Sequence, residues 1–168
     1  NWINTDVFKP VNTDGLRSKY GIRENDFVIL GASGQWMIAK GLSDFLELSK
    51  HLGANEKIVL IGHIDNKNIT LPDNIINIKY TDAVDELVAL YNMADLFLNC
   101  SVEESFGKVS AEALACGMPV ICFNSTANPE IICDGCGSVV EVHDIKAVYN
   151  EIEKIKANGK EFYTEQCV

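Results

Sequence analysis

The chain has 168 residues, the size of one ordinary domain, of which 47% are hydrophobic and 23% charged. This composition excludes a disordered or fibrous chain, and a net charge of −10 excludes a protein that binds nucleic acid or anionic membranes by general attraction to phosphate. The sequence predicts neither a membrane span nor a signal peptide. Because the first residue is not Met and falls in a predicted loop, we expect a piece of a longer protein.

Apolar runs rich in β-branched residues alternate along the chain with segments of helical spacing. Residues 1–26 are predicted as a lead-in segment with a short helix at 16–20. Six continuous apolar runs are typical of strands buried on both faces: 27–32, 57–62, 75–79, 95–99, 119–123 and 138–142. Apolar stripes with helical periodicity lie between or after them: Leu42 to Leu52, Val84 to Tyr91, Val109 to Leu114, and 144–157.

This alternation predicts an α/β fold, a doubly wound, Rossmann-like parallel sheet with helices on both faces. The chain is read as one domain over residues 1–168, with a core at 27–157 and a tail at 158–168. In such folds ligands bind beyond the carboxyl ends of the strands. The loops after the strands are therefore the first candidates for a functional site.

The loop after the first predicted strand, residues 31–41, contains small residues, Gly34 among them, and ends in Lys40-Gly41 at a helix start. Backbone N–H groups, a helix N-terminus and one lysine can together hold a diphosphate. The segment matches neither the P-loop nor the G-x-G-x-x-G pattern. The alternative is that Lys40 is an ordinary exposed lysine.

The segment after the fourth predicted strand, residues 103–112, opens another helix. Gly107 allows a ligand to approach the backbone closely, and the free N–H groups near residues 106–109 can meet an anion. Glu112 lies among small apolar residues, where a sugar diol would supply the hydrogen-bond donors that a carboxylate needs. The alternative is that Glu103 and Glu104 only favour the helix dipole and Glu112 caps a local group.

The segment after the fifth predicted strand, residues 124–130, ends in Asn128-Pro129-Glu130. Its small polar residues can present N–H groups to a phosphate or a sugar. They can equally be a helix cap, with Asn128 at the N-cap and Pro129 at the first helical position.

Of the six cysteines, only Cys133 and Cys136 have the spacing of a metal or redox pair. No second pair or suitably placed histidine accompanies them, and the segment runs into a predicted turn and strand rather than a helix. We expect reduced thiols in a cytoplasmic protein.

Taken together, these segments resemble the family-4 retaining glycosyltransferases, which have GT-B architecture. Glu104 and Glu112 have the E-x7-E spacing of that family, and residues 1–10 are similar to the segment that opens its C-terminal domain. Lys40-Gly41, 60–62 and 90–96 follow in the family's order and spacing. The resemblance covers essentially the whole chain and implies the donor-binding half of a two-domain enzyme, whose N-terminal acceptor-binding domain would belong to the same longer chain.

The resemblance implies a role for each motif residue. Lys40 would contact the donor diphosphate and stabilise the leaving group, and Glu104 would face the transferred sugar; these two form the expected catalytic pair. Glu112 would bind the ribose hydroxyls, and the backbone of residues 106–108 would meet the sugar and the distal phosphate. The expected substrate-binding residues are Gly34, Gln35, Lys40, Glu104, Phe106, Gly107, Lys108 and Glu112.

Three positions depart from the family pattern. Gln35 stands where the family usually has an arginine, so one cation for the diphosphate is missing. Thr126-Ala127 replaces a Gly-Gly step, and Cys100 replaces a proline. Lys108 is the candidate to restore the missing charge; the alternative is that it is solvated and offsets Glu103 or Glu104.

The resemblance implies a metal-independent hexosyltransferase of polysaccharide biosynthesis, with a nucleotide-diphospho-sugar as donor and no cofactor. We expect no nucleic-acid partner and no direct membrane contact from this segment, although the full-length enzyme could lie at the inner face of the membrane. Two alternatives remain: a nucleotide-sugar epimerase of the same architecture, and a non-catalytic interaction module.

Overall fold

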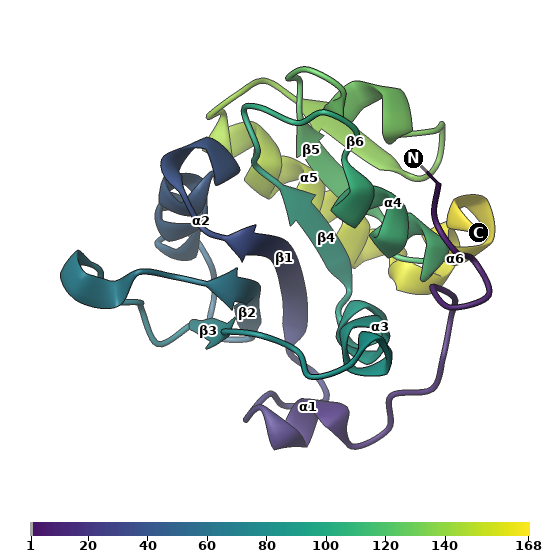
Figure 1. Ribbon diagram of the computed structural model, residues 1–168, viewed down its shortest axis with the longest axis horizontal. Helices are drawn as coiled ribbons and strands as arrows, with labels where there is room; N and C mark the ends of the chain where they lie inside the picture. Colours follow the sequence, from purple (N-terminus) through teal and green to yellow (C-terminus); the bar gives the residue numbers. More distant parts are fainter. Residues whose placement is uncertain (1) are drawn as a thin grey trace.

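A computed structural model describes residues 2–168, so Asn1, the first residue of the segment that resembles the opening of the family's C-terminal domain, lies outside the described residues. Its six strands form one parallel sheet in the order β3-β2-β1-β4-β5-β6 (Figure 1). The strands are β1 (Phe27–Gln35), β2 (Glu56–His63), β3 (Ile75–Ile78), β4 (Leu96–Asn99), β5 (Val120–Phe123) and β6 (Gly137–Val140). The doubly wound sheet predicted from the sequence is confirmed.

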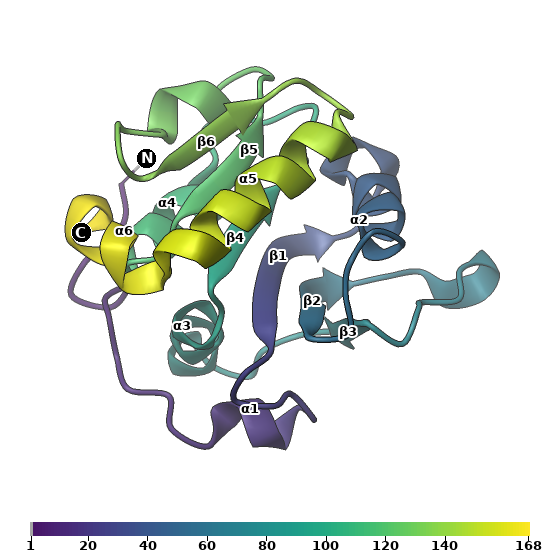
Figure 2. The ribbon, with the colours of Figure 1, turned by 180° about the vertical axis from the view of Figure 1, so that it is seen from behind.

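Helices cover both faces of the sheet. Because successive side chains of a strand point to opposite faces, Val28 and Leu30 belong to one hydrophobic core and Ile29 to the other. The first core is closed by α3 (Val84–Met93) and α4 (Lys108–Ala115), the second by α2 (Leu42–Ser49) and α5 (Ile145–Asn158). Figure 2, the view from behind, shows α5 in front of the sheet and α2 beside the end of β1.

The two ends of the chain pack against the same helix, α3. The lead-in contains α1 (Leu16–Lys19), and its Phe8 ring lies edge-on to Tyr91, with 6.2 Å between ring centroids. Residues 158–168, expected to be a tail, instead form α6 (Lys160–Cys167), whose Tyr163 is buried in the second core. The sequence did not predict this helix because its docking depends on contacts with other elements, among them α5, the end of α3 and Gly117, and not on a strong apolar stripe of its own.

Some element boundaries differ from the prediction near the site. Strand β1 continues to Gln35, three residues further than expected, because it stays paired with β2 as far as His63. Three short 3-10 helices occur in the loops: η1 (Ile38–Lys40), η2 (Asn66–Asn68) and η3 (Asn128–Ile131). Asn128 is the first residue of η3 and not its N-cap, since its buried side chain is hydrogen-bonded to Asn99 and Ser101.

Within residues 2–168, none of the helices combines the length and the apolar character needed to cross a membrane.

Candidate functional site

The site lies where the chain order of the strands reverses, between β1 and β4, at their carboxyl ends. The segment that follows β1 and the loop that follows β4 come into close backbone contact there. Gly41 has a φ of 79°, and a Cβ at this position would lie 2.3 Å from Cys100 Cβ, so only glycine fits. The N–H of Val102 donates to the carbonyl of Ala39 over 3.0 Å. These contacts bring η1 against the loop that follows β4.

Lys40 and Glu104 form an ion pair across this junction. Lys40 Nζ lies 3.3 Å from Glu104 Oε2, and both side chains are partly buried. The Glu104 backbone is held in turn by the loop after β5: its N–H donates to Thr126 Oγ1 over 2.9 Å, and its carbonyl accepts from the N–H of Ala127 over 3.3 Å. Three loops therefore fix the position of the Glu104 carboxylate.

The N-terminus of α4 is fixed by Gly107, whose φ of 74° is the left-handed conformation that glycine adopts most easily. A Cβ on Gly107 would lie 2.5 Å from Ile131 Cδ1, so η3 packs directly against this turn. Below the turn, the buried Asn99 side chain donates to Ser110 Oγ over 2.9 Å and to Asn128 Oδ1 over 3.2 Å. This network sets the direction of α4, whose N-terminus carries the positive end of the helix dipole.

A cavity of about 170 Å³ lies at this N-terminus. Two lysines from different elements, Lys40 of η1 and Lys108 of α4, line it together with Gly34 and Glu104. Two ammonium groups beside a helix N-terminus favour an anion with more than one charge. The arrangement is suited to a diphosphate.

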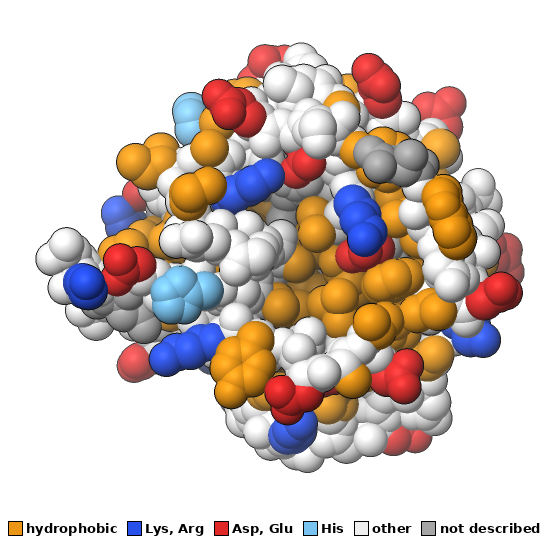
Figure 3. Space-filling view, in the orientation of Figure 1, with side chains coloured by type: hydrophobic (Ala, Val, Ile, Leu, Met, Phe, Trp, Pro, Cys, Tyr) orange, Lys and Arg blue, Asp and Glu red, His pale blue; other side chains and the backbone are white. Residues whose placement is uncertain are grey.

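A second cavity, of about 330 Å³, contains Glu112 and shares Gly34 with the first. Its walls are mostly apolar and include Ile61, Leu87 and Val109. Figure 3 shows a hollow with a hydrophobic floor on this face of the molecule, with basic and acidic side chains at its edge.

Glu112 is a nearly buried carboxylate with two partners. Tyr91 donates its hydroxyl to Glu112 Oε2 over 3.0 Å, and Lys108 Nζ lies 3.8 Å from Glu112 Oε1. Burial raises the pKa of Glu112, and the Tyr91 hydroxyl and the Lys108 charge oppose that rise. A ligand that brings hydroxyl donors to this carboxylate would stabilise its charged form.

Most of the residues expected from the sequence meet at these two cavities. Gly34, Lys40, Glu104 and Lys108 line the first, Gly34 and Glu112 line the second, and Gly107 caps α4. Gln35 and Phe106 line neither cavity. Gln35 sits on the longer β1 strand, where its exposed position is set by pairing with β2.

Two residues that help to position the site glutamates were not singled out as site residues by the sequence analysis. Tyr91 was assigned to an apolar helix stripe and to the 90–96 segment of the family resemblance, and no local pattern signals that its hydroxyl reaches Glu112. Thr126 was noted only as part of a departure from the family pattern. Its φ of 47°, unusual for a β-branched residue, places Oγ1 against the Glu104 N–H.

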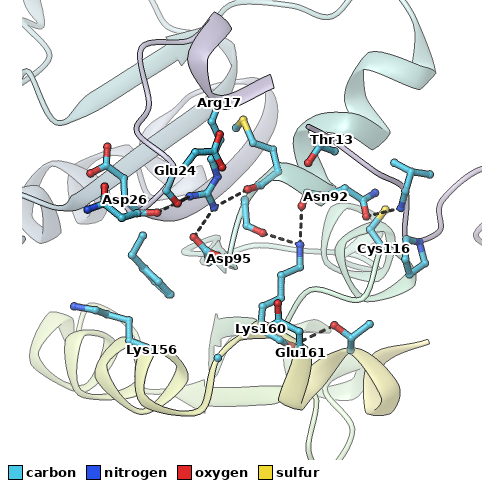
Figure 4. Close-up of a pocket in the computed structure, with 18 residues that line it drawn as sticks. Thr13, Arg17, Glu24, Asp26, Asn92, Asp95, Cys116, Lys156, Lys160 and Glu161 are labelled. Atoms are coloured by element: carbon cyan, nitrogen blue, oxygen red, sulfur yellow. Dashed lines mark hydrogen bonds and ion pairs between the residues drawn. The ribbon is translucent and has the colours of Figure 1, made fainter. Parts of the chain in front are cut away.

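A larger cavity, of about 670 Å³, lies at the opposite edge of the sheet, beside the starts of β1 and β4. Two of its cations, Arg17 and Lys160, are engaged within the protein (Figure 4). Arg17 donates to the carbonyls of Glu24, Asp26 and Met93 and to Asp95, and Lys160 donates to the carbonyls of Asn92 and Ala94. These bonds serve to attach α1 and α6 to the end of α3.

Solved structures with this fold are GT-B glycosyltransferases. The chain matches the C-terminal domain of a glycosyl transferase group 1 family protein (LpcC) from Francisella tularensis with a TM-score of 0.78 at 23% identity, over 97% of this chain and 92% of that chain. It matches Anabaena HepE, solved in complex with UDP and glucose, with a TM-score of 0.83 at 20% identity, over 98% of this chain and 48% of that chain. The class defined by the fold is therefore the Rossmann-like domain of the GT-B architecture.

Sequence comparison identifies the family. Residues 12–165 match the family model described as "Glycosyl transferases group 1". The chain is 30% identical over 168 residues to the capsular polysaccharide biosynthesis glycosyltransferase CapM of Staphylococcus aureus, over 92% of this chain and 43% of CapM. It is 30% identical to the N-acetyl-alpha-D-glucosaminyl L-malate synthase of Bacillus anthracis, over 90% of this chain and 42% of that protein. The chain belongs to the glycosyl transferases group 1 and spans less than half the length of these relatives.

Proposed function

We propose that this chain is the donor-binding half of a retaining glycosyltransferase that moves a sugar from a nucleotide-diphospho-sugar to an acceptor in polysaccharide biosynthesis. The observation that carries the proposal is the meeting of Lys40, Glu104 and Lys108 at one cavity beside the N-terminus of α4. Glu112 lies in the adjoining cavity, at a place where a nucleoside can continue from a diphosphate.

In this reaction Lys40 stabilises the leaving group. Negative charge grows on the diphosphate as the bond from the sugar to the phosphate breaks, and a cation and N–H dipoles already aimed at that charge lower the barrier. Lys108 and the N-terminus of α4 add to the same field. With this charge supplied by the chain, we propose a reaction that needs no metal.

The two motif glutamates have separate roles. Glu104, held by the loops after β1 and β5, faces the transferred sugar, and the backbone of residues 106–108 contacts the sugar and the distal phosphate. Glu112 accepts hydrogen bonds from the two ribose hydroxyls, since a nearly buried carboxylate with an available oxygen is matched by a pair of neighbouring donors.

The relatives support the nature of the substrates. CapM is named for capsular polysaccharide biosynthesis, and HepE was solved with UDP and with UDP-glucose. We therefore propose a nucleotide-sugar donor, with a uridine nucleotide the first to test. In keeping with its six free cysteines, we assign the activity to the cytoplasm.

The test is calorimetric binding of UDP, GDP and ADP to the chain and to Glu112→Gln. The amide preserves the shape of the side chain but not the charge, so we expect nucleotide affinity to fall by ten-fold or more while the melting temperature is maintained. Glu151→Gln is the matched control, because Glu151 also accepts a hydroxyl, from Ser138 over 2.6 Å, and lines neither cavity. Unchanged affinity in Glu112→Gln would overturn the ribose role.

A further inference from the structure

The Tyr91 hydroxyl is the one buried phenol that reaches the site. It lies on α3, outside every loop that carries the motif residues, and donates to Glu112 Oε2 over 3.0 Å. The Tyr91 side chain is fully buried. Tyr91 lines the second cavity beside Glu112, and its hydroxyl is committed to that carboxylate.

The Tyr91 ring cannot move without disturbing the first core. Phe8 of the lead-in lies edge-on to it at 6.2 Å, and the Phe97 ring of β4 lies at 5.7 Å. A buried aromatic ring packed on two sides holds its hydroxyl at a defined point. That point is an anchor for one oxygen of the carboxylate.

The anchored carboxylate has one committed oxygen and one available oxygen. Oε2 is occupied by the tyrosine, whereas Oε1 has only the Lys108 ammonium at 3.8 Å, on a lysine side chain that is 69% exposed. The plane of the carboxylate is thus set by Tyr91, and Oε1 remains for a ligand.

We infer that Tyr91 is a positioning residue for nucleotide binding: its hydroxyl orients Glu112 and favours the charged carboxylate that accepts the ribose hydroxyls. This inference rests on the proposed function. The ionisable groups that face Glu112 are Tyr91 on α3, Lys108 at the start of α4 and Cys116 just after its end. Lys79 and Tyr80, from the segment after β3, line the same cavity. Of these, Tyr91 and Lys108 favour the carboxylate, and Tyr91 alone is fixed by packing.

Tyr91→Phe separates positioning from packing, because phenylalanine retains the ring between Phe8 and Phe97. We expect UDP to bind about ten-fold more weakly at pH 7.5, by calorimetry below the melting temperature. Loss of the hydroxyl also removes a donor that lowers the pKa of Glu112, so this pKa rises. UDP binds the carboxylate form of Glu112, so affinity falls when Glu112 takes up a proton. As the solution is acidified, we expect Tyr91→Phe to lose UDP affinity at a higher pH than the native chain does.

The matched control is Tyr20→Phe. Tyr20 also donates its hydroxyl to a glutamate of α3, Glu86, over 3.2 Å, and lines neither cavity. We expect its affinity and pH profile to equal those of the native chain.

The variants are then combined in a cycle with Glu112→Gln. If Tyr91 acts through Glu112, Tyr91→Phe weakens UDP binding much less in the Glu112→Gln background than in the native one. The positioning role would be refuted if Tyr91→Phe kept the native UDP affinity and pH profile while Glu112→Gln bound UDP more weakly. The proposed function would then remain intact. An equal loss in both backgrounds would likewise refute action through Glu112. Native affinity in Glu112→Gln would instead refute the ribose role of Glu112 on which this inference rests.

Discussion

At the scale of residues, both lysines of the first cavity are paired with a motif glutamate. Lys40 lies 3.3 Å from Glu104, and Lys108 lies 3.8 Å from Glu112. The sequence predicted either a ligand role for Lys108 or an offset of Glu103 or Glu104; the structure gives it Glu112 as a partner instead. Because the Lys108 side chain is 69% exposed, this pair contributes little to stability and the ammonium is free to turn toward an anion.

A cycle of Lys108→Met with Gln35→Arg tests whether Lys108 replaces the missing arginine. A charged contact contributes about 1.5–3 kcal/mol, so we expect Lys108→Met to weaken nucleoside diphosphate binding roughly ten- to a hundred-fold in the native background. With Gln35→Arg present, a second cation is supplied and the loss becomes much smaller. Calorimetry gives the four affinities.

The control for this cycle is Lys154→Met, which removes an exposed lysine of α5 paired with Glu151. Its affinity should match that of the native chain. Equal losses on Lys108→Met in the two backgrounds would make Lys108 an ordinary surface lysine. Gln35 lines neither cavity, so an arginine there acts only through its longer side chain.

At the scale of elements, the end of α3 is the attachment point for segments from both ends of the chain. The last carbonyl groups of α3 have no hydrogen-bond partners within the helix. Cationic side chains of α1 and α6 donate hydrogen bonds to them. Lys160 donates to the carbonyls of Asn92 and Ala94, each over 2.8 Å, and Arg17 donates to that of Met93 over 3.0 Å. Burial of the ammonium lowers the pKa of Lys160, whose bonds to the two carbonyls are drawn in Figure 4.

Lys160→Met tests this attachment. The substitution retains much of the side-chain volume but leaves two carbonyls without a donor, so we expect the free energy of unfolding to fall by about 1–3 kcal/mol. Urea denaturation followed by circular dichroism measures the change. Lys154→Met again serves as the control, with an expected change within about 0.5 kcal/mol. A Lys160→Met chain as stable as the native one would mean that α6 is held by Tyr163 and its other apolar contacts alone.

At the scale of the whole molecule, an acidic chain places two lysines beside one helix N-terminus. The net charge is −10, yet Lys40, Lys108 and the N-terminus of α4 converge at the carboxyl ends of β1 and β4. We therefore expect a phosphate to be held by local geometry and not by the overall field.

The 168-residue chain is expected to bind a nucleoside diphosphate but to transfer no sugar. It covers 43% of CapM, and holding donor and acceptor together supplies a large part of the barrier reduction in a transfer reaction. The measurement is sugar release and transfer from UDP-, GDP- and ADP-sugars to added acceptors, beside calorimetric binding of the nucleotides. Transfer by this chain alone would contradict the division of donor and acceptor sites between two domains.

The sequence by itself determined the layered fold and the candidate loops. Continuous apolar runs such as 27–32 and 119–123 are local signals, and they correspond to buried parallel strands in β1 and β5. Because the carboxyl ends of parallel strands lie at one edge of a sheet, the motifs around Lys40 and Glu104 were expected on the same side. The structure shows them there.

Only the tertiary structure decided which side chains meet. The pairs Lys40–Glu104 and Tyr91–Glu112 join different elements, and the attachment of α6 through Lys160 joins residues still further apart in the chain. Such contacts depend on how the helices pack on the sheet, which no local pattern encodes. For the same reason the segment after residue 158 was read as a tail: its weak amphipathic pattern becomes a helix only when α3 provides carbonyl partners and the second core buries Tyr163.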